Sequence, residues 1–174
     1  NSGRPESPAT GQIDDWLYEN ATAIAMRRND WSYTCNLNVR GYKVGFHAEA
    51  SPVEGRPNGH NYGFNLKDCQ TGVLITSSSG SGIMFTNVNT QGCATGVRLC
   101  GGAEGPVQFY GCDIDGKTVA VEMDEEASSA LMFQDCRVTG PTSVRGGHFQ
   151  AVNNTFGADV TVEAKARCVS LIHI

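Results

Sequence analysis

Short segments with alternating apolar and polar positions recur along the chain, and each is followed by a second such segment and then by a glycine. The repeating unit is roughly 21–24 residues long, a length typical of solenoid repeats. Phenylalanines recur at the same place in successive units, at Phe64, Phe85, Phe109 and Phe133. This pattern predicts coils of short parallel strands stacked on one another, with one internal ladder of aromatic rings.

A second position repeats a few residues after each phenylalanine and holds a cysteine or an asparagine. We expect these side chains to form another inward ladder, made of Cys69, Asn89, Cys112, Cys136 and Asn154. A glycine follows each one, where the backbone must bend. We therefore predict an all-β fold, a right-handed parallel β-helix (solenoid) of about six to seven coils.

Other architectures fit this pattern less well. A β-sandwich would need hairpin turns between its strands and would not keep a constant ladder. A leucine-rich repeat would need Leu and Asn at fixed offsets, which this sequence lacks.

The chain divides into an N-terminal part and a repetitive part. Helical periodicity is confined to residues 13–19, so we place a short capping helix there, within an extension or linker over residues 1–22. Residues 23–174 are the predicted β-helix. The last segment, residues 168–174, is apolar and has no polar closing segment, so we expect the solenoid to belong to a longer one.

Composition and charge exclude some classes of function. The formal net charge is −5 and the sequence pI is about 5.3, whereas a nucleic-acid surface needs a basic patch. No apolar run is long enough for a membrane span. The seven cysteines contain no pair of CxxC units. Cys112 and Cys136 fall at equivalent places in adjacent coils, where they would form a disulfide or remain stacked thiols.

The coil endings FYGCDIDG (residues 109–116) and FQDCRVTG (residues 133–140) resemble the pectate-lyase-like superfamily of right-handed parallel β-helices. Residues 26–46 are similar to the middle coils of β-helix proteins related to glycoside hydrolase family 28 and to phage tailspikes. The resemblance implies a secreted bacterial protein that acts on or binds polysaccharides. The family's paired Asp-Asp and Gly-His-Gly motifs have only partial counterparts here, in Asp113 and Asp115 and in the sequence Gly59-His60-Asn61.

The first strand of each coil predicts the main candidate site. Its inward residues are expected to be Met26, Phe46, Ile75, Leu99, Val121, Val144 and Val162. The outward column formed by their neighbours would then hold Arg27, His47, Thr76, Arg98, Glu122, Arg145 and Glu163. Glu122 and Asp124 lie two residues apart on the same side, a separation suited to glycoside hydrolysis. Arg98 and His47 would suit the neutralising and basic groups of a lyase. We therefore predict Glu122, Asp124, His47 and Arg98 as catalytic residues, with a solvated, charge-alternating β-face as the alternative.

Three further features supply candidate binding residues. An insertion at residues 48–59 interrupts one coil, and Glu49, Glu54, Arg56 and His60 lie in or beside it. Trp31 would be a sugar-stacking platform or a cap on the core. The predicted substrate-binding residues are Arg27, Trp31, Glu49, Glu54, Arg56, His60, Arg145 and Glu163. Asp113 and Asp115 share one face of a strand, where they would bind calcium or accept hydrogen bonds from turn amides.

The sequence thus predicts an extracellular or cell-surface protein whose partner is a carbohydrate. It would act as a glycosidase or polysaccharide lyase, with no cofactor other than calcium and no nucleic-acid or membrane partner. The alternative is a non-catalytic carbohydrate-binding or adhesive solenoid, which includes a piece of a larger enzyme or of a phage tailspike. In the latter cases its partners would be the remainder of its own β-helix or further copies of the chain.

Overall fold

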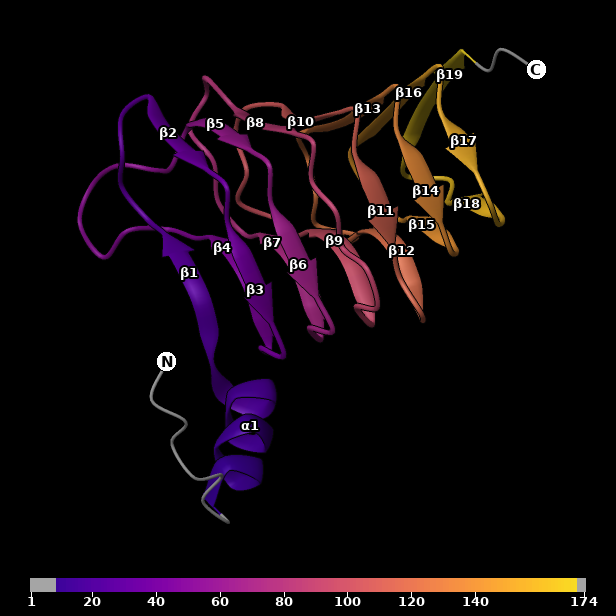
Figure 1. The fold of residues 1–174 in the computed structure, drawn as a ribbon. Helices are drawn as coiled ribbons and strands as arrows, with labels where there is room; N and C mark the ends of the chain where they lie inside the picture. The colour runs from indigo at the N-terminus through magenta and orange to yellow at the C-terminus, as the bar shows by residue number, and fades with distance from the viewer. Residues whose placement is uncertain (1–8, 172–174) are drawn as a thin grey trace.

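Parallel strands wind through three sheets that together form a β-solenoid (Figure 1), as the repeat predicted. The computed structural model describes residues 9–171. The first sheet contains β1 (Thr22–Met26), β4 (Val44–Ala48), β7 (Thr71–Ile75), β9 (Thr95–Leu99), β12 (Val119–Met123), β15 (Thr142–Val144) and β18 (Val160–Val162). The second sheet contains β2 (Ser32–Cys35), β5 (Gly59–Tyr62), β8 (Ile83–Thr86), β10 (Val107–Tyr110), β13 (Ala130–Gln134), β16 (His148–Val152) and β19 (Arg167–Leu171).

The third face of each coil carries shorter strands. They are β3 (Asn38–Arg40), β6 (Asn65–Lys67), β11 (Asp113–Asp115), β14 (Arg137–Thr139) and β17 (Thr155–Phe156). The strands β3 and β6 form one small sheet, and β11, β14 and β17 form another. Asn89 lies between the two sheets and pairs with Asn65 of the first and Asp113 of the second. We refer to this continuous face as the third sheet.

One residue in the left-handed conformation bends the chain between the second and third sheets after each of the strands β2, β5, β8, β10, β13 and β16. Asn36, Asn87, Asp135 and Asn153 have φ values of 57°, 54°, 54° and 53°, and two glycines occupy the same place in the other coils. Asn, Asp and Gly are the residues that adopt this conformation most readily. The turn therefore explains why an Asn, Asp or Gly follows these strands of the second sheet.

The aromatic ladder lies in the core, but it includes one phenylalanine fewer than predicted. Phe85, Phe109 and Phe133 are in register, with ring centroids 4.7 and 5.0 Å apart and nearly parallel planes. The equivalent position in the preceding coil is Asn61, which pairs with Phe85. Phe64 is buried three residues later. The sequence interval between Phe64 and Phe85 is shorter than the other intervals because these two residues are not equivalent.

The cysteine and asparagine ladder also needs a correction. The backbone N–H of Cys112 donates to the sulfur of Cys136 at 3.3 Å, and that of Cys136 donates to Oδ1 of Asn154 at 2.8 Å, as expected for stacked positions. Asn89 pairs with Asp113 one residue further along, so it does not belong to this ladder. Cys69 lies elsewhere, beside Cys93. A shift of one residue along a strand turns a side chain to the opposite face. All seven cysteines are free thiols.

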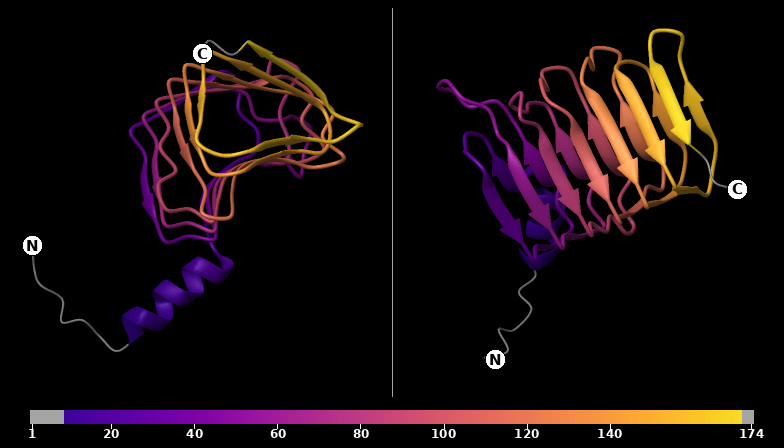
Figure 2. Two further views of the ribbon diagram at one scale, coloured as in Figure 1. Left: turned by 90° about the vertical axis from the view of Figure 1, so that its right-hand side faces the viewer. Right: turned by 90° about the horizontal axis from the view of Figure 1, so that it is seen from above.

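The predicted helix is present as α1 (Ala9–Asn20). Seen along the solenoid axis, it lies to one side of the coils (Figure 2). Two hydrogen bonds join the helix to the coils. The backbone N–H of Lys43 donates to the carbonyl of Leu17, and the side-chain amide of Gln70 donates to the carbonyl of Tyr18. Predictions for residues 1–8 and 172–174 fall outside the described residues. No helix within residues 9–171 is long and apolar enough to cross a membrane.

Candidate functional site

The outer face of the first sheet carries the predicted catalytic residues, in a different register from the one expected. Phe46 pairs with Ile24 and Val73, and Val121 pairs with Val97. The predicted column therefore mixed residues from two rows of the same face. Residues two apart on a strand point to the same face but lie beside different residues of the neighbouring strands. One row contains Ala25, His47, Leu74, Arg98, Glu122, Ser143 and Thr161. The row two residues later contains Arg27, Glu49, Thr76, Cys100, Asp124, Arg145 and Glu163.

Glu122 and Asp124 lie together, and both are bound by two arginines. A single nitrogen of Arg145 lies 2.7 Å from Glu122 and 2.8 Å from Asp124. Arg98 approaches the same two carboxylates at 3.4 and 2.9 Å. This arrangement, which we term the arginine–carboxylate network, brings together Glu122, Asp124 and Arg98 with Arg145, the arginine predicted beside Glu122 in the outward column.

The network keeps Asp124 ionised. Burial works to raise the pKa of its carboxyl, but the hydrogen bonds from Arg98 and Cys100 and the charges of both arginines outweigh burial, so the pKa is lowered. Burial and the neighbouring Asp124 raise the pKa of the Cys100 thiol to about 11. At neutral pH the pair is therefore a carboxylate beside a neutral thiol.

His47 belongs to a separate cluster. Its Nε2 lies 2.9 Å from the hydroxyl of Thr76, and its Nδ1 lies 3.4 Å from Glu49, which is also held by Arg27 at 2.6 Å. Burial is the main cause that lowers the pKa of His47; Arg27 acts in the same direction and Glu49 opposes it. Leu74 stands between His47 and Arg98 in the row. The four predicted catalytic residues thus fall into two groups about 10 Å apart, two strand spacings.

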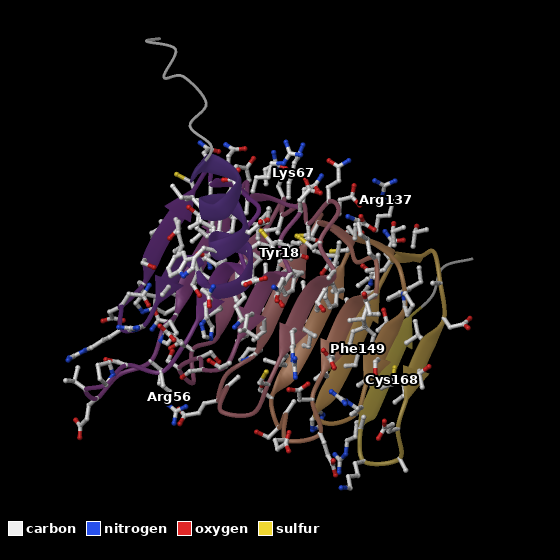
Figure 3. All side chains as sticks on the ribbon, turned by 90° about the horizontal axis from the view of Figure 1, so that it is seen from below. Tyr18, Arg56, Lys67, Arg137, Phe149 and Cys168 are labelled. Carbon is white, nitrogen blue, oxygen red and sulfur yellow. The ribbon has the colours of Figure 1, made fainter. Side chains whose placement is uncertain are left out.

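The insertion at residues 48–59 extends from the coils and carries Arg56. The Arg56 guanidinium donates to the carbonyl of Gly102 at 2.5 Å and lies 3.0 Å from Glu104. A hollow of about 540 Å³ lies between this insertion and the turn after β1, lined by Arg28, Asn29, Asp30, Gly55, Arg56, Asn58 and Ser79. Figure 3 shows Arg56 on the side of the molecule opposite Lys67 and Arg137. Glu54 is exposed in the same insertion, and Glu163 is exposed just after β18.

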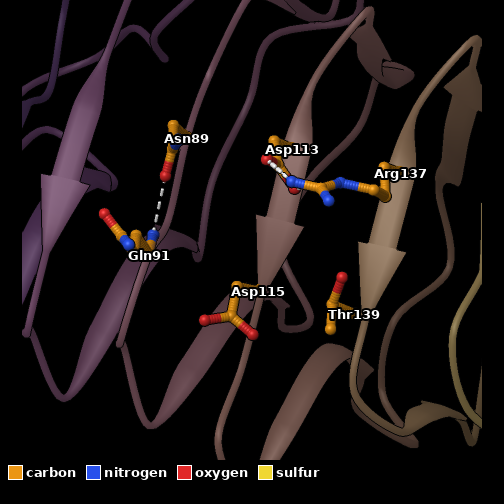
Figure 4. A pocket seen from close by; sticks show the side chains of 6 residues that line it. All are labelled: Asn89, Gln91, Asp113, Asp115, Arg137 and Thr139. Carbon is orange, nitrogen blue, oxygen red and sulfur yellow. Dashed lines mark hydrogen bonds and ion pairs between the residues drawn. The ribbon is translucent and has the colours of Figure 1, made fainter.

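The third sheet brings Asp113 and Asp115 to one face, with Ile114 buried behind them as predicted. A hollow of about 440 Å³ is lined there by Asn89, Gln91, Asp113, Asp115, Arg137 and Thr139 (Figure 4). Arg137 forms a two-pronged ion pair with Asp113. Asp115 accepts a hydrogen bond from the backbone N–H of Gly92 at 3.0 Å. Across the described chain, no group of three or more His, Cys, Asp or Glu side chains is placed to hold a metal ion.

The outer face of the second sheet carries a cluster of exposed aromatic side chains. Trp31 is 63% exposed, Tyr33 is 79% exposed and Tyr62 is 48% exposed. Trp31 precedes β2 with a positive φ of 49°, and its backbone N–H donates to Asn58 at 2.5 Å. His60, the neighbour of Tyr33 on β5, is 2.8 Å from the hydroxyl of Thr86. A hollow of about 320 Å³ is lined by Trp31, Tyr33, Gly59, His60, Ser81, Gly82, Ile83, Met84 and Gln108. We term it the aromatic hollow.

Sequence reasoning identified Trp31 and His60 but missed Tyr33, Met84 and Gln108. A usable signal was present, because the second strand of each coil alternates as clearly as the first. Applying the alternation to that strand would have placed these three side chains on one outer face.

Comparisons with known proteins give no family assignment. The chain matches no protein-family model, no curated protein and no solved structure.

Proposed function

We propose that this protein is a carbohydrate-binding β-solenoid whose binding site is the aromatic hollow, and that it acts outside the cell. The observation that carries the proposal is the exposure of Trp31 and Tyr33 beside the half-buried His60. An exposed aromatic ring loses favourable apolar burial unless something covers it. A sugar ring has an apolar face for the aromatic rings and hydroxyls for the polar groups of His60 and Gln108.

The electrostatics of the first sheet support a non-catalytic function. Glycoside hydrolysis needs one protonated carboxyl as general acid, and such a group has a raised pKa. Asp124 instead has a lowered pKa, and Glu122 is bound by the same two arginines. Both carboxylates are therefore occupied in ion pairs that strengthen the sheet.

Catalysis on the first sheet is the second candidate, with Glu122, Asp124, His47 and Arg98 as its residues. One observation favours it. The His47 imidazole is hydrogen-bonded to the Thr76 hydroxyl through Nε2, and its Nδ1 lies 3.4 Å from the Glu49 carboxylate, an arrangement in which a base can activate a hydroxyl.

A polysaccharide panel that records binding and product release together separates the two candidates. We expect the wild type to bind without releasing products, and Trp31→Asn combined with Tyr33→Ala to lose binding; Asn suits the positive φ at position 31. The matched control is Trp16→Ala with Tyr18→Ala, two exposed aromatics on α1. Products that vanish in Glu122→Gln or His47→Gln would favour catalysis. Absence of binding across neutral and acidic glycans would contradict both.

A further inference from the structure

Beyond the aromatic hollow, two adjacent rows on the outer face of the second sheet contain no charged residue, and the nearest cation is Arg167 at the start of β19. The strand register aligns Tyr33, His60, Met84, Gln108, Met132, Gln150 and Val169 in one outward row. The row two residues later contains Cys35, Tyr62, Thr86, Tyr110, Gln134 and Val152. Neither row contains Asp, Glu, Lys or Arg, although charged residues dominate the outer face of the first sheet.

A second hollow continues the aromatic hollow along these rows. It is small, about 20 Å³, and its lining includes Tyr110, Met132, Gln134, Gln150 and Val152. Both hollows reach β10, because Gln108 lines the first and Tyr110 lines the second. Together they form a strip that runs across the strands, parallel to the solenoid axis.

From these rows we infer that the strip binds an extended, uncharged glycan that lies along the solenoid axis, with successive sugars on successive coils. This inference rests on the proposed function and names its ligand class. Strands of neighbouring coils repeat at about 4.8 Å, so β2 to β16 spans five such intervals, roughly 24 Å. That repeat is close to the length of one sugar in an extended chain, so each sugar can lie over one coil.

The side chains of the strip suit a neutral sugar better than they suit a protein partner. Amide and hydroxyl groups from Thr86, Gln108 and Gln150 are interspersed with the rings of Tyr62 and Tyr110. A glycan hydroxyl can pair with each polar group, whereas an apolar protein surface would leave them unpaired at a cost of about 1–3 kcal/mol for each buried group. The amide of Gln108 donates to the sulfur of Met132 at 3.6 Å. A thioether sulfur is a weak acceptor, so a sugar hydroxyl would be a better partner for this amide.

The test is the dependence of affinity on chain length for two uncharged extended series, cello-oligosaccharides and chito-oligosaccharides, from disaccharide to hexasaccharide. We expect at least one series to gain roughly tenfold or more in affinity with length. Raising the salt concentration should leave the affinity unchanged, because no ion pairs form. An oligogalacturonate of equal length should bind more weakly, because neither row contains a lysine or arginine between β2 and β16 to pair with its carboxylates.

Two variants on the part of the strip beyond the aromatic hollow locate the chain. Tyr110→Ala and Gln150→Ala should weaken hexasaccharide binding several-fold and leave disaccharide binding unchanged. The matched controls, Tyr18→Ala on α1 and Gln91→Ala on the third sheet, should change neither.

Three outcomes would overturn the inference. Disaccharide binding that depends on Tyr33 but gains nothing with length would reject the strip and leave the proposed function intact. No binding of any glycan would reject both. Self-association that Met132→Lys abolishes, measured by sedimentation velocity, would show instead that the strip is an interface between copies of the chain.

Discussion

The first and second sheets consist of strands from the same coils at the same spacing, yet their outer faces differ. On the first sheet, Arg98, Glu122, Asp124 and Arg145 form ion pairs with one another in the arginine–carboxylate network. On the second sheet, Trp31 and Tyr33 are largely uncovered. Groups that are already paired within the protein lose those partners when a ligand binds, whereas uncovered rings gain contacts. The difference indicates that the first face stabilises the fold and the second face is available for binding.

The largest effect should come from removing the exposed rings. Trp31→Asn with Tyr33→Ala should weaken carbohydrate binding by roughly 100-fold, about 2–3 kcal/mol, because truncated aromatic anchors have effects of this size. The free energy of unfolding should stay within about 0.5 kcal/mol of wild type, as for most surface substitutions. Calorimetric titration and urea unfolding measure the two quantities. Unchanged binding would remove the distinction between the faces.

The arginine–carboxylate network should respond in the opposite way. Asp124→Ala should lower the free energy of unfolding by about 2 kcal/mol, because it leaves parts of two guanidinium groups without an acceptor. Carbohydrate binding should not change. Arg40→Ala, which breaks one exposed ion pair with Asp68, is the control and should change the free energy of unfolding by about 0–1 kcal/mol. A stable Asp124→Ala protein that no longer binds carbohydrate would reverse the assignment of the two faces.

The same network predicts how stability depends on acid. Because the folded protein lowers the pKa of Asp124, the unfolded chain binds a proton more readily. The stabilisation is therefore complete above the ordinary carboxyl pKa and is lost as the pH falls below about 4. Urea unfolding between neutral pH and about pH 3 should show a steeper loss for wild type than for Asp124→Asn. Parallel pH curves for the two proteins would contradict a role for this carboxylate in the network.

His47 should give the smallest effect. Its pKa is lowered, mainly by burial, so the unfolded chain again binds the proton first. The contribution of neutral His47 to stability is present above the ordinary histidine pKa of about 6.5 and is lost as the pH falls through the lowered value. His47→Gln should therefore flatten the pH dependence of the free energy of unfolding between about pH 7 and 5. An unchanged slope would show that His47 is equally easy to protonate in both states.

The coils and their inward ladders could be predicted from the sequence because burial enforces a period of two. The exact rows could not be predicted. The sequence pattern favours Phe64 as a member of the phenylalanine ladder because it is apolar. The structure instead aligns the polar Asn61, three residues earlier, with Phe85. The turn residues Asn36, Asn87, Asp135 and Asn153 would have fixed the register of four coils, because each follows the end of a strand of the second sheet.

The candidate site on the first sheet could also be predicted only in part. Glu122, Asp124 and Arg98 were predicted to lie together, since alternation and coil stacking determine both face and neighbourhood. Sequence alone does not reveal whether charged neighbours neutralise one another, because that depends on side-chain geometry such as the contact of one Arg145 nitrogen with both carboxylates.

Hydroxyl-radical footprinting with a glycan from the panel tests the central claim most directly. The second face is rich in readily oxidised side chains, among them Trp31, Tyr33 and Met84, and the first face has its own reporters in His47, Leu74 and Cys100. We predict that the bound glycan protects Trp31, Tyr33 and Met84 from oxidation and leaves the three reporters of the first face unchanged. Protection of His47, Leu74 and Cys100 with continued oxidation of Trp31 and Tyr33 would contradict the account and place the ligand on the charged face.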